Sequence, residues 1–157
     1  MTSKEKIKLN LNSALKQGKD IEVLVLRQLL AAFLNKEKEK KFQQKQDQVE
    51  LTDQETIEVV FSEAKKRREA IREFGKGNRQ DLVEKEKQEL KVLEEYLPEQ
   101  LSEQEIEKLV IEAINKTQAK QIQDMGKVMA ELMIKVKGKA DGELVSKIVK
   151  QQLLKND

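Results

Sequence analysis

Apolar residues recur every three or four positions along most of this chain, which is the spacing of one face of an α-helix. The first such stretch begins after Thr2 and Glu5, which are spaced as a capping box, and it stops at Gly18. A second stretch runs from about Asp20 through Phe33. The pattern therefore predicts two helices joined by a short turn at Gly18.

The tract from Lys36 to Gln48 follows this second stretch and has no apolar stripe. Two interpretations are open, a solvated extension of the second helix or a mobile arm. The sequence favours the exposed helix, because lysine, glutamate and glutamine lose little rotamer freedom in a helix.

Two further helices are predicted before the single proline. Thr52 and Glu55 form a second capping box ahead of an apolar stripe that ends at Gly75–Gly77. Asn78 is expected to cap the next helix. Pro98 stops that helix, because the residue before a proline resists helical geometry.

Three shorter amphipathic helices are predicted after Pro98. Ser102 and Glu105 form a third capping box. Asp124 and Asp141 are each expected to cap one of the two helices that follow. Each of these helices has one apolar face, so together they predict a compact bundle.

Composition supports the same fold class. Charged residues make up 38% of the 157 residues and aromatic residues only 3%, with one proline. Such a chain is rich in good helix formers and has aliphatic rather than aromatic cores. We predict an all-α protein with an N-terminal multi-helix domain over residues 1–97 and a small C-terminal three-helix bundle over residues 98–157.

Several function classes are excluded or disfavoured by what the sequence lacks. It contains no Cys and no His, which removes thiol catalysis, Cys-based zinc sites and the commonest general base. No nucleophile elbow, P-loop or dinucleotide-binding glycine pattern occurs. We expect no catalytic residue, metal or cofactor. The longest apolar run, Leu29–Leu34, is far too short to span a membrane, and no signal peptide is apparent, so a soluble cytoplasmic protein is expected.

The net charge is only +2, but the basic residues are unevenly distributed. Residues 65–79 hold seven basic residues against two acidic ones, and residues 120–139 hold five against two. The run KKRRE from residue 65 lies on the third predicted helix, where most of it is expected to point outward or sideways. It fits either a solvated face or a patch for RNA phosphates. Base stacking is disfavoured, because aromatic residues are nearly absent.

Three of the six glycines lie between residues 124 and 142. Gly138 can adopt the positive φ that ends a helix, and Asp141 can cap the next helix. The lysines at 135, 137 and 139 alternate into this corner, beside a helix N-terminus that favours anions. The segment fits either a simple helix–helix corner or a corner that also contacts phosphate.

Gly126 lies in the first turn of a predicted helix, where glycine costs up to about 1 kcal/mol relative to alanine. Two explanations are open, close approach of another helix or close approach of a ligand. The first is favoured.

Taken together, the motifs resemble the GatB/YqeY family, in order and over nearly the whole chain. The matching segments are LRQLLAAFLNKE (26–37), EAKKRREAIREFGKGNRQDLVEKEKQEL (63–90), YLPEQLSEQEI (96–106), DMGKVM (124–129) and KGKADG (137–142). The third segment and the last two are the most specific. The resemblance implies a free-standing, all-helical protein whose C-terminal bundle is similar to the tail of the B subunit of the tRNA-dependent amidotransferase.

In that complex, which converts misacylated Glu-tRNA(Gln) or Asp-tRNA(Asn), the tail helps to hold the tRNA near its elbow. The family is also associated with carbon–nitrogen ligase activity that uses glutamine as amido donor. The chain resembles neither the kinase-like cradle nor the glutaminase of the complex, so the resemblance implies a tRNA-binding accessory module rather than an enzyme acting alone. The alternative is a helical protein–protein adaptor without RNA binding.

The resemblance also indicates where tRNA would be contacted. The expected nucleic-acid-binding residues are Lys127, Lys135, Lys137, Gly138, Lys139, Asp141 and Gly142. A secondary basic patch is expected from Lys65, Lys66, Arg67, Arg68 and Arg72. The expected partners are tRNA and an amidotransferase or another tRNA-handling protein.

Overall fold

The computed structural model describes residues 1–155, and these form an all-α fold, as predicted from the sequence. Its elements in chain order are α1 (Ser3–Gln17), α2 (Asp20–Gln44), α3 (Asp53–Lys76), α4 (Gln80–Glu94), α5 (Glu103–Thr117), the short 3-10 helix η1 (Ile122–Asp124), α6 (Met125–Val136) and α7 (Gly142–Lys155). In the described part of the chain, no helix is both long enough and apolar enough to cross a membrane.

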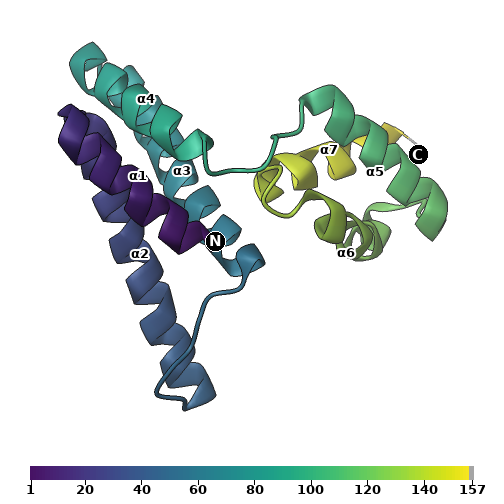
Figure 1. The fold of residues 1–157 in the computed structure, drawn as a ribbon. Helices are drawn as coiled ribbons and strands as arrows, with labels where there is room; N and C mark the ends of the chain where they lie inside the picture. The colour runs from purple at the N-terminus through teal and green to yellow at the C-terminus, as the bar shows by residue number, and fades with distance from the viewer. Residues whose placement is uncertain (156–157) are drawn as a thin grey trace. The chain divides into compact units, whose positions relative to one another are not determined.

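The chain divides into two compact units, an N-terminal unit (Met1–Leu97) and a C-terminal unit (Pro98–Asp157). In the N-terminal unit, α1 packs against α2 and α3 packs against α4, and α2 also contacts both α3 and α4 (Figure 1). Phe33, Leu26 and Leu29 of α2 are among its most deeply buried side chains. Ile7 from α1, Val60 from α3 and Leu93 from α4 complete this core, so all four helices contribute to it.

The C-terminal unit is a bundle of α5, α6 and α7, each of which packs against the other two. Its core is aliphatic. The fully buried side chains from the three helices are Ile106, Val110, Val128, Leu132, Val136, Val145, Val149 and Leu153.

The three predicted capping boxes are confirmed. Thr2, Thr52 and Ser102 each accept a hydrogen bond from the backbone N–H three residues on, and the glutamate at that position accepts one in return. Gly18 ends α1 with a φ of 68°, also as predicted. These signals depend only on neighbouring residues, so the sequence is sufficient to show them.

Two predicted caps are wrong. Asn78 has a φ of 57°, and the following N–H of Arg79 donates to the carbonyl of Phe74 at 2.9 Å, so Asn78 terminates α3 rather than starting α4. Asp124 makes no capping hydrogen bond to α6. Its carboxylate instead accepts from the backbone N–H groups of Lys120 and Gln121, at 2.9 and 3.2 Å, and so folds back over η1. These two hydrogen bonds hold the pKa of Asp124 below its usual value.

The charged tract from Lys36 to Gln48 is helical as far as Gln44, so the helical interpretation is confirmed for most of it; none of these residues is buried, and Lys36, Glu37, Lys40 and Lys41 are partly exposed. Lys45 then adopts a φ of 53° and ends α2. The remaining residues of the tract belong to the segment that leads to α3.

Candidate nucleic-acid interface

The corner between α6 and α7 is a tight turn built on Gly138. Lys137 has φ −59° and ψ 123°, Gly138 has a φ of 78°, and the N–H of Lys139 donates to the carbonyl of Val136 at 2.8 Å. These values describe a type II turn, which requires a positive φ at its third residue and therefore favours glycine there. The predicted conformation of Gly138 is confirmed, and the turn is sufficient to explain it.

The backbone of this turn is fixed to the segment that precedes α5. The side chain of Gln100 donates to the carbonyl of Gly138 at 2.9 Å, and the N–H of Leu101 donates to the carbonyl of Lys139 at 2.9 Å. Gly138 is buried. Its backbone therefore has a structural role, and the surface of the corner consists of the side chains on either side of it.

Asp141 caps α7, as predicted. One of its carboxylate oxygens accepts from the N–H of Glu143 at 3.0 Å, and its carbonyl accepts from Val145. A carboxylate is thus already placed at the helix N-terminus, where an external anion would otherwise be favoured. Any attraction of this corner for phosphate must therefore come mainly from its lysines.

The predicted lysines are on the surface. Lys135, Lys137 and Lys139 are all exposed, and they surround one fixed turn. Lys127 is also exposed but lies eight residues before Lys135 on α6, about 12 Å along the helix axis. The structure therefore brings three of the four predicted lysines together at the corner and places the fourth at the far end of α6.

The two remaining predicted glycines are not required by close packing. Apart from the adjoining residues and the backbone of its own helix, a Cβ atom added at Gly126 would meet no atom within 4 Å, and the same holds for Gly142. Gly126 lies on the exposed face of α6. The favoured explanation for Gly126, close approach of another helix, is therefore wrong.

Two features of this surface were missed by sequence reasoning. Ile134 of α6 is 85% exposed, directly before Lys135. Lys116 of α5 forms an ion pair with Glu131 of α6, and the hydrogen bond from Lys116 lowers the pKa of Glu131. Glu131 lies one turn before Lys135 and carries the one acidic charge near the middle of this helix face. The positive charge of Lys116 offsets it.

The predicted secondary patch is only partly a surface. Lys66 and Arg72 are exposed, whereas Arg67 is turned into the N-terminal unit and is only 9% exposed. Lys65 and Arg68 are partly buried, and Arg68 lies 3.9 Å from Glu94. Three of the four basic residues of the run, Lys65, Lys66 and Arg68, are therefore exposed or partly exposed, in agreement with an outward or sideways orientation, and Arg67 is the exception.

Arg67 is held by side chains from three helices. It donates a hydrogen bond to Gln28 of α2, and its guanidinium lies 3.7 Å from the carboxylate of Glu63 and 3.6 Å from that of Glu89. Glu89 is 5% exposed, so this is a buried ion pair. Burial and the neighbouring Glu89 also raise the pKa of Glu86 on α4. Arg67 thus connects α2, α3 and α4 and is not available to RNA.

Comparisons with known proteins agree with the motifs. The chain shares 35% identity over 103 residues with the Altered inheritance of mitochondria protein 41, mitochondrial, of Pyrenophora tritici-repentis, which covers 64% of this chain and 56% of that protein. It shares 33% identity over 98 residues with the E subunit of the Glutamyl-tRNA(Gln) amidotransferase of Thermococcus gammatolerans, which covers 60% of this chain and 15% of that relative. The matched regions are therefore little more than half of the first relative and a small part of the second.

The family comparison covers far more of the chain. Residues 4–153 match the family described as Yqey-like protein, and this range includes all of α2 to α6 and most of α1 and α7. The chain therefore belongs to the GatB/YqeY family of YqeY-like proteins.

Proposed function

We propose that the C-terminal unit is a tRNA-binding module that contacts the phosphate backbone through the lysines around the α6–α7 corner. The observation that carries this proposal is the exposure of Lys135, Lys137 and Lys139 around a turn whose backbone is fixed by hydrogen bonds to Gln100 and Leu101. A fixed turn presents its charges without the loss of backbone freedom that a flexible loop incurs on binding. The amidotransferase named as a relative of this chain supports tRNA as the nucleic acid.

The proposed recognition is of phosphate and shape rather than of bases. The sequence contains one Tyr, four Phe and no Trp, and all five aromatic residues lie before residue 98. The C-terminal unit therefore has no aromatic side chain on which a base could stack. Lysine contacts to phosphates give an affinity that falls with salt and depends little on sequence. The module would then hold a folded tRNA for an amidotransferase or another tRNA-handling protein, without catalysis of its own.

The test is binding of a fluorescently labelled tRNA to the full chain, measured by anisotropy over a series of salt concentrations. Lys137→Glu/Lys139→Glu is expected to weaken binding and to lower the slope of log affinity against log salt by about two, one for each lost phosphate contact. The matched control is Lys147→Glu/Lys150→Glu, which changes the same charge at two exposed positions of α7.

The two double variants separate a local contact from a general effect of charge. Weakening by the corner variant alone supports the proposal. If both variants weaken tRNA binding equally, tRNA is attracted by the net charge of the chain. If the corner variant binds tRNA with unchanged affinity, that result would count against any tRNA contact at the corner. A third variant, Lys66→Glu/Arg72→Glu, tests the exposed part of the secondary patch in the same assay.

The proposed compartment is the cytoplasm. The Pyrenophora relative has the word mitochondrial in its name, so the two locations are real alternatives for the family. Fractionation of cells that express the tagged native protein distinguishes them.

A further inference from the structure

The end of α2, residues 34–44, is not held by an apolar core, and we call it the extension of α2. All of the buried residues of α2 lie between Val23 and Phe33, and none follows Phe33. Figure 1 shows the end of this helix extending past the rest of the N-terminal unit, accompanied by the segment that returns to α3. A helix end of this kind, rich in charge and without buried residues, would fray in isolation.

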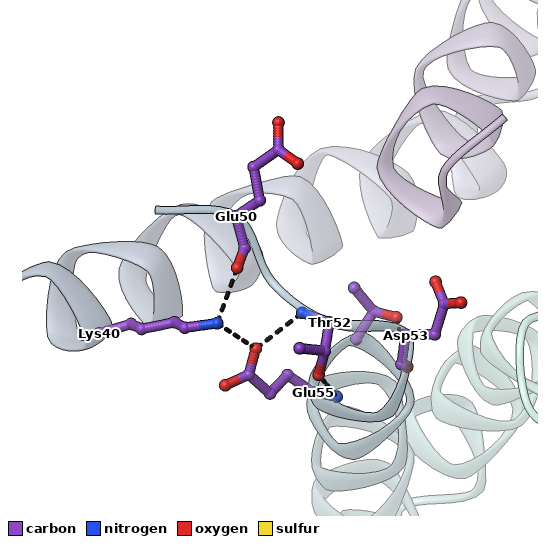
Figure 2. A network of polar contacts seen from close by, with 6 residues as sticks. Lys40, Glu50, Thr52, Asp53 and Glu55 are labelled. Carbon is purple, nitrogen blue, oxygen red and sulfur yellow. Dashed lines mark hydrogen bonds and ion pairs between the residues drawn. The ribbon is translucent and has the colours of Figure 1, made fainter. Parts of the chain in front are cut away.

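A polar clasp fixes this extension instead. The ammonium group of Lys40 donates to the backbone carbonyl of Glu50 at 2.7 Å and to the carboxylate of Glu55 at 2.8 Å (Figure 2). The same carboxylate oxygen of Glu55 accepts from the N–H of Thr52 at 2.7 Å. Lys40 is largely buried by these contacts, with 15% of its side chain exposed. The clasp therefore joins the extension of α2 to the first turn of α3.

The side of α2 opposite the clasp presents an apolar and basic surface that begins at Arg27 and continues along the extension. We call it the α2 outer face. Its residues are all exposed and follow one another at intervals of three or four positions, which places them on one side of the helix and its last turn. They are Arg27, Ala31, Leu34, Lys38, Phe42 and Lys45. Phe42 is 86% exposed and Leu34 is 46% exposed.

The acidic residues of the extension are turned away from this face. Glu37 forms an ion pair with Lys4 of α1 at 2.7 Å, and Glu39 lies 3.5 Å from Lys36. The six residues of the outer face include three basic residues and no acidic one. Asp47 lines the same hollow as Phe42 and Lys45, together with Lys41, so the charge there stays positive. The apolar side chains of the outer face are set between the positive charges.

We propose that the α2 outer face docks an acidic amphipathic helix of a partner protein, with Leu34 and Phe42 as the apolar contacts. Charge selects this occupant. A second copy of the chain would bring the same positive face against itself, which costs free energy, whereas glutamates or aspartates beside a leucine stripe would complement it. Leu34 and Phe42 are exposed, and each lies about one turn from Lys38, so together they give a helix a place to bury its apolar face.

The occupant is a protein helix rather than RNA because half of the residues that form the outer face are apolar. Phosphate contacts would use the three basic residues and leave Leu34 and Ala31 without a role. This proposal is independent of the proposed tRNA contact, which uses the other unit of the chain.

The test is selection from a displayed library of helical peptides of about 18 residues, five turns, in which one face is randomised. The bait is the full chain, and the counter-bait is the Leu34→Ser/Phe42→Ser variant. Both substituted side chains are exposed, so the variant is expected to keep the circular dichroism of the wild type. Selected peptides are expected to carry Leu or Ile bordered by Asp or Glu, and to bind the counter-bait at least about tenfold more weakly.

A charge swap then tests complementarity. The variant Lys38→Glu/Lys45→Glu is expected to bind the selected peptides more weakly. It should instead prefer versions of these peptides in which the acidic residues are replaced by lysine. Lys147→Glu/Lys150→Glu, with the same change of charge on α7, is the control and should bind them unchanged.

Three results of the peptide experiments would each overturn the proposal: no peptide that discriminates the bait from the counter-bait, selected peptides without an excess of acidic residues, or a charge swap without effect. Loss of tRNA affinity in Leu34→Ser/Phe42→Ser would assign the face to RNA and overturn it as well. Failure of the tRNA proposal would show in the corner variants, so the two outcomes are distinguishable.

Discussion

The two units of this protein bury different kinds of side chain. In the N-terminal unit, Thr56, Arg67 and Glu89 are buried together with the aliphatic core. Within the described residues of the C-terminal unit, every buried side chain is apolar. The family relationship covers both units, so the difference lies inside one family architecture rather than between unrelated parts.

The difference indicates how each unit keeps a unique structure. Four helices of 15 to 25 residues meet in the N-terminal unit, and Arg67 of α3 contacts side chains of both α2 and α4 there. A buried ion pair adds little net stability, but one partner without the other is costly. The C-terminal unit has helices of 12 to 15 residues and depends on aliphatic packing, with its lysines on the surface.

The largest expected effect comes from breaking the buried ion pair. Arg67→Met leaves Glu89 buried without its cation and is expected to destabilise the N-terminal unit by about 3–5 kcal/mol. Arg67→Met/Glu89→Leu removes both charges and should recover most of that loss. Urea unfolding followed by tyrosine fluorescence measures this, because Tyr96, the single Tyr in a chain without Trp, packs on the N-terminal core. Equal instability of the single and double variants would contradict this account of Arg67.

A comparable effect is expected from a cavity in the other unit. Leu132 is fully buried, so Leu132→Ala should cost about 2–5 kcal/mol. Ile134→Ala, two residues along the same helix but 85% exposed in the wild type, is the control and should change stability by less than about 0.5 kcal/mol. Circular dichroism reports both units and Tyr96 reports only the N-terminal one. If residues 1–97 and 98–157 are separate domains, Leu132→Ala shifts the first signal and leaves the second unchanged.

The sequence predicts the features of this fold that depend on near neighbours. The capping boxes at Thr2, Thr52 and Ser102 need only a residue and its neighbour three positions on, and all three are confirmed. The predicted caps at Asn78 and Asp124 are wrong because the same residue types also end helices and close turns, and the sequence alone does not show which use applies.

Contacts between distant residues explain what the sequence did not show. Arg67 turns inward because Gln28 and Glu89, 39 and 22 positions away, meet it there. The carbonyl of Gly138 is taken by Gln100, 38 positions earlier, so a backbone that was expected near phosphate is buried. The lysines of the corner were correctly expected on the surface, and their contact with tRNA stays a prediction.

Removal of a helix cap is expected to lower the free energy of unfolding by a smaller amount, and by the same amount in both units. Thr52→Ala in the N-terminal unit and Ser102→Ala in the C-terminal unit each remove a side-chain acceptor for the N–H three residues on. Each should cost about 1 kcal/mol. Urea unfolding of the two variants measures this. A much larger loss in one unit would show that its cap also contributes to tertiary packing, which would weaken the contrast between the cores.

The smallest expected effect is a pH dependence that differs between the units. Glu55 has a pKa below its ordinary value of 4.5, first because of the hydrogen bond from Lys40 and then because of that from Thr52. A carboxyl group whose pKa is lower in the folded state stabilises the protein above its unfolded pKa, and this contribution is lost as the pH falls through the folded value. Asp124 in the C-terminal unit behaves in the same way around its ordinary value of 3.8.

The N-terminal unit should therefore lose less stability below pH 4.5 in the Glu55→Gln variant than in the wild type. In the same way, the C-terminal unit should lose less stability below pH 3.8 in the Asp124→Asn variant. Unfolding in urea at neutral pH and at about pH 3, followed by Tyr96 fluorescence and by circular dichroism, separates the two. Because Glu55 also closes the clasp on Lys40, its variant should increase hydrogen exchange in residues 34–44 at neutral pH, whereas Asp124→Asn leaves that segment unchanged. Unchanged exchange in the Glu55 variant would mean that the extension of α2 is ordered without the clasp, and the rigid display of Phe42 would then need another explanation.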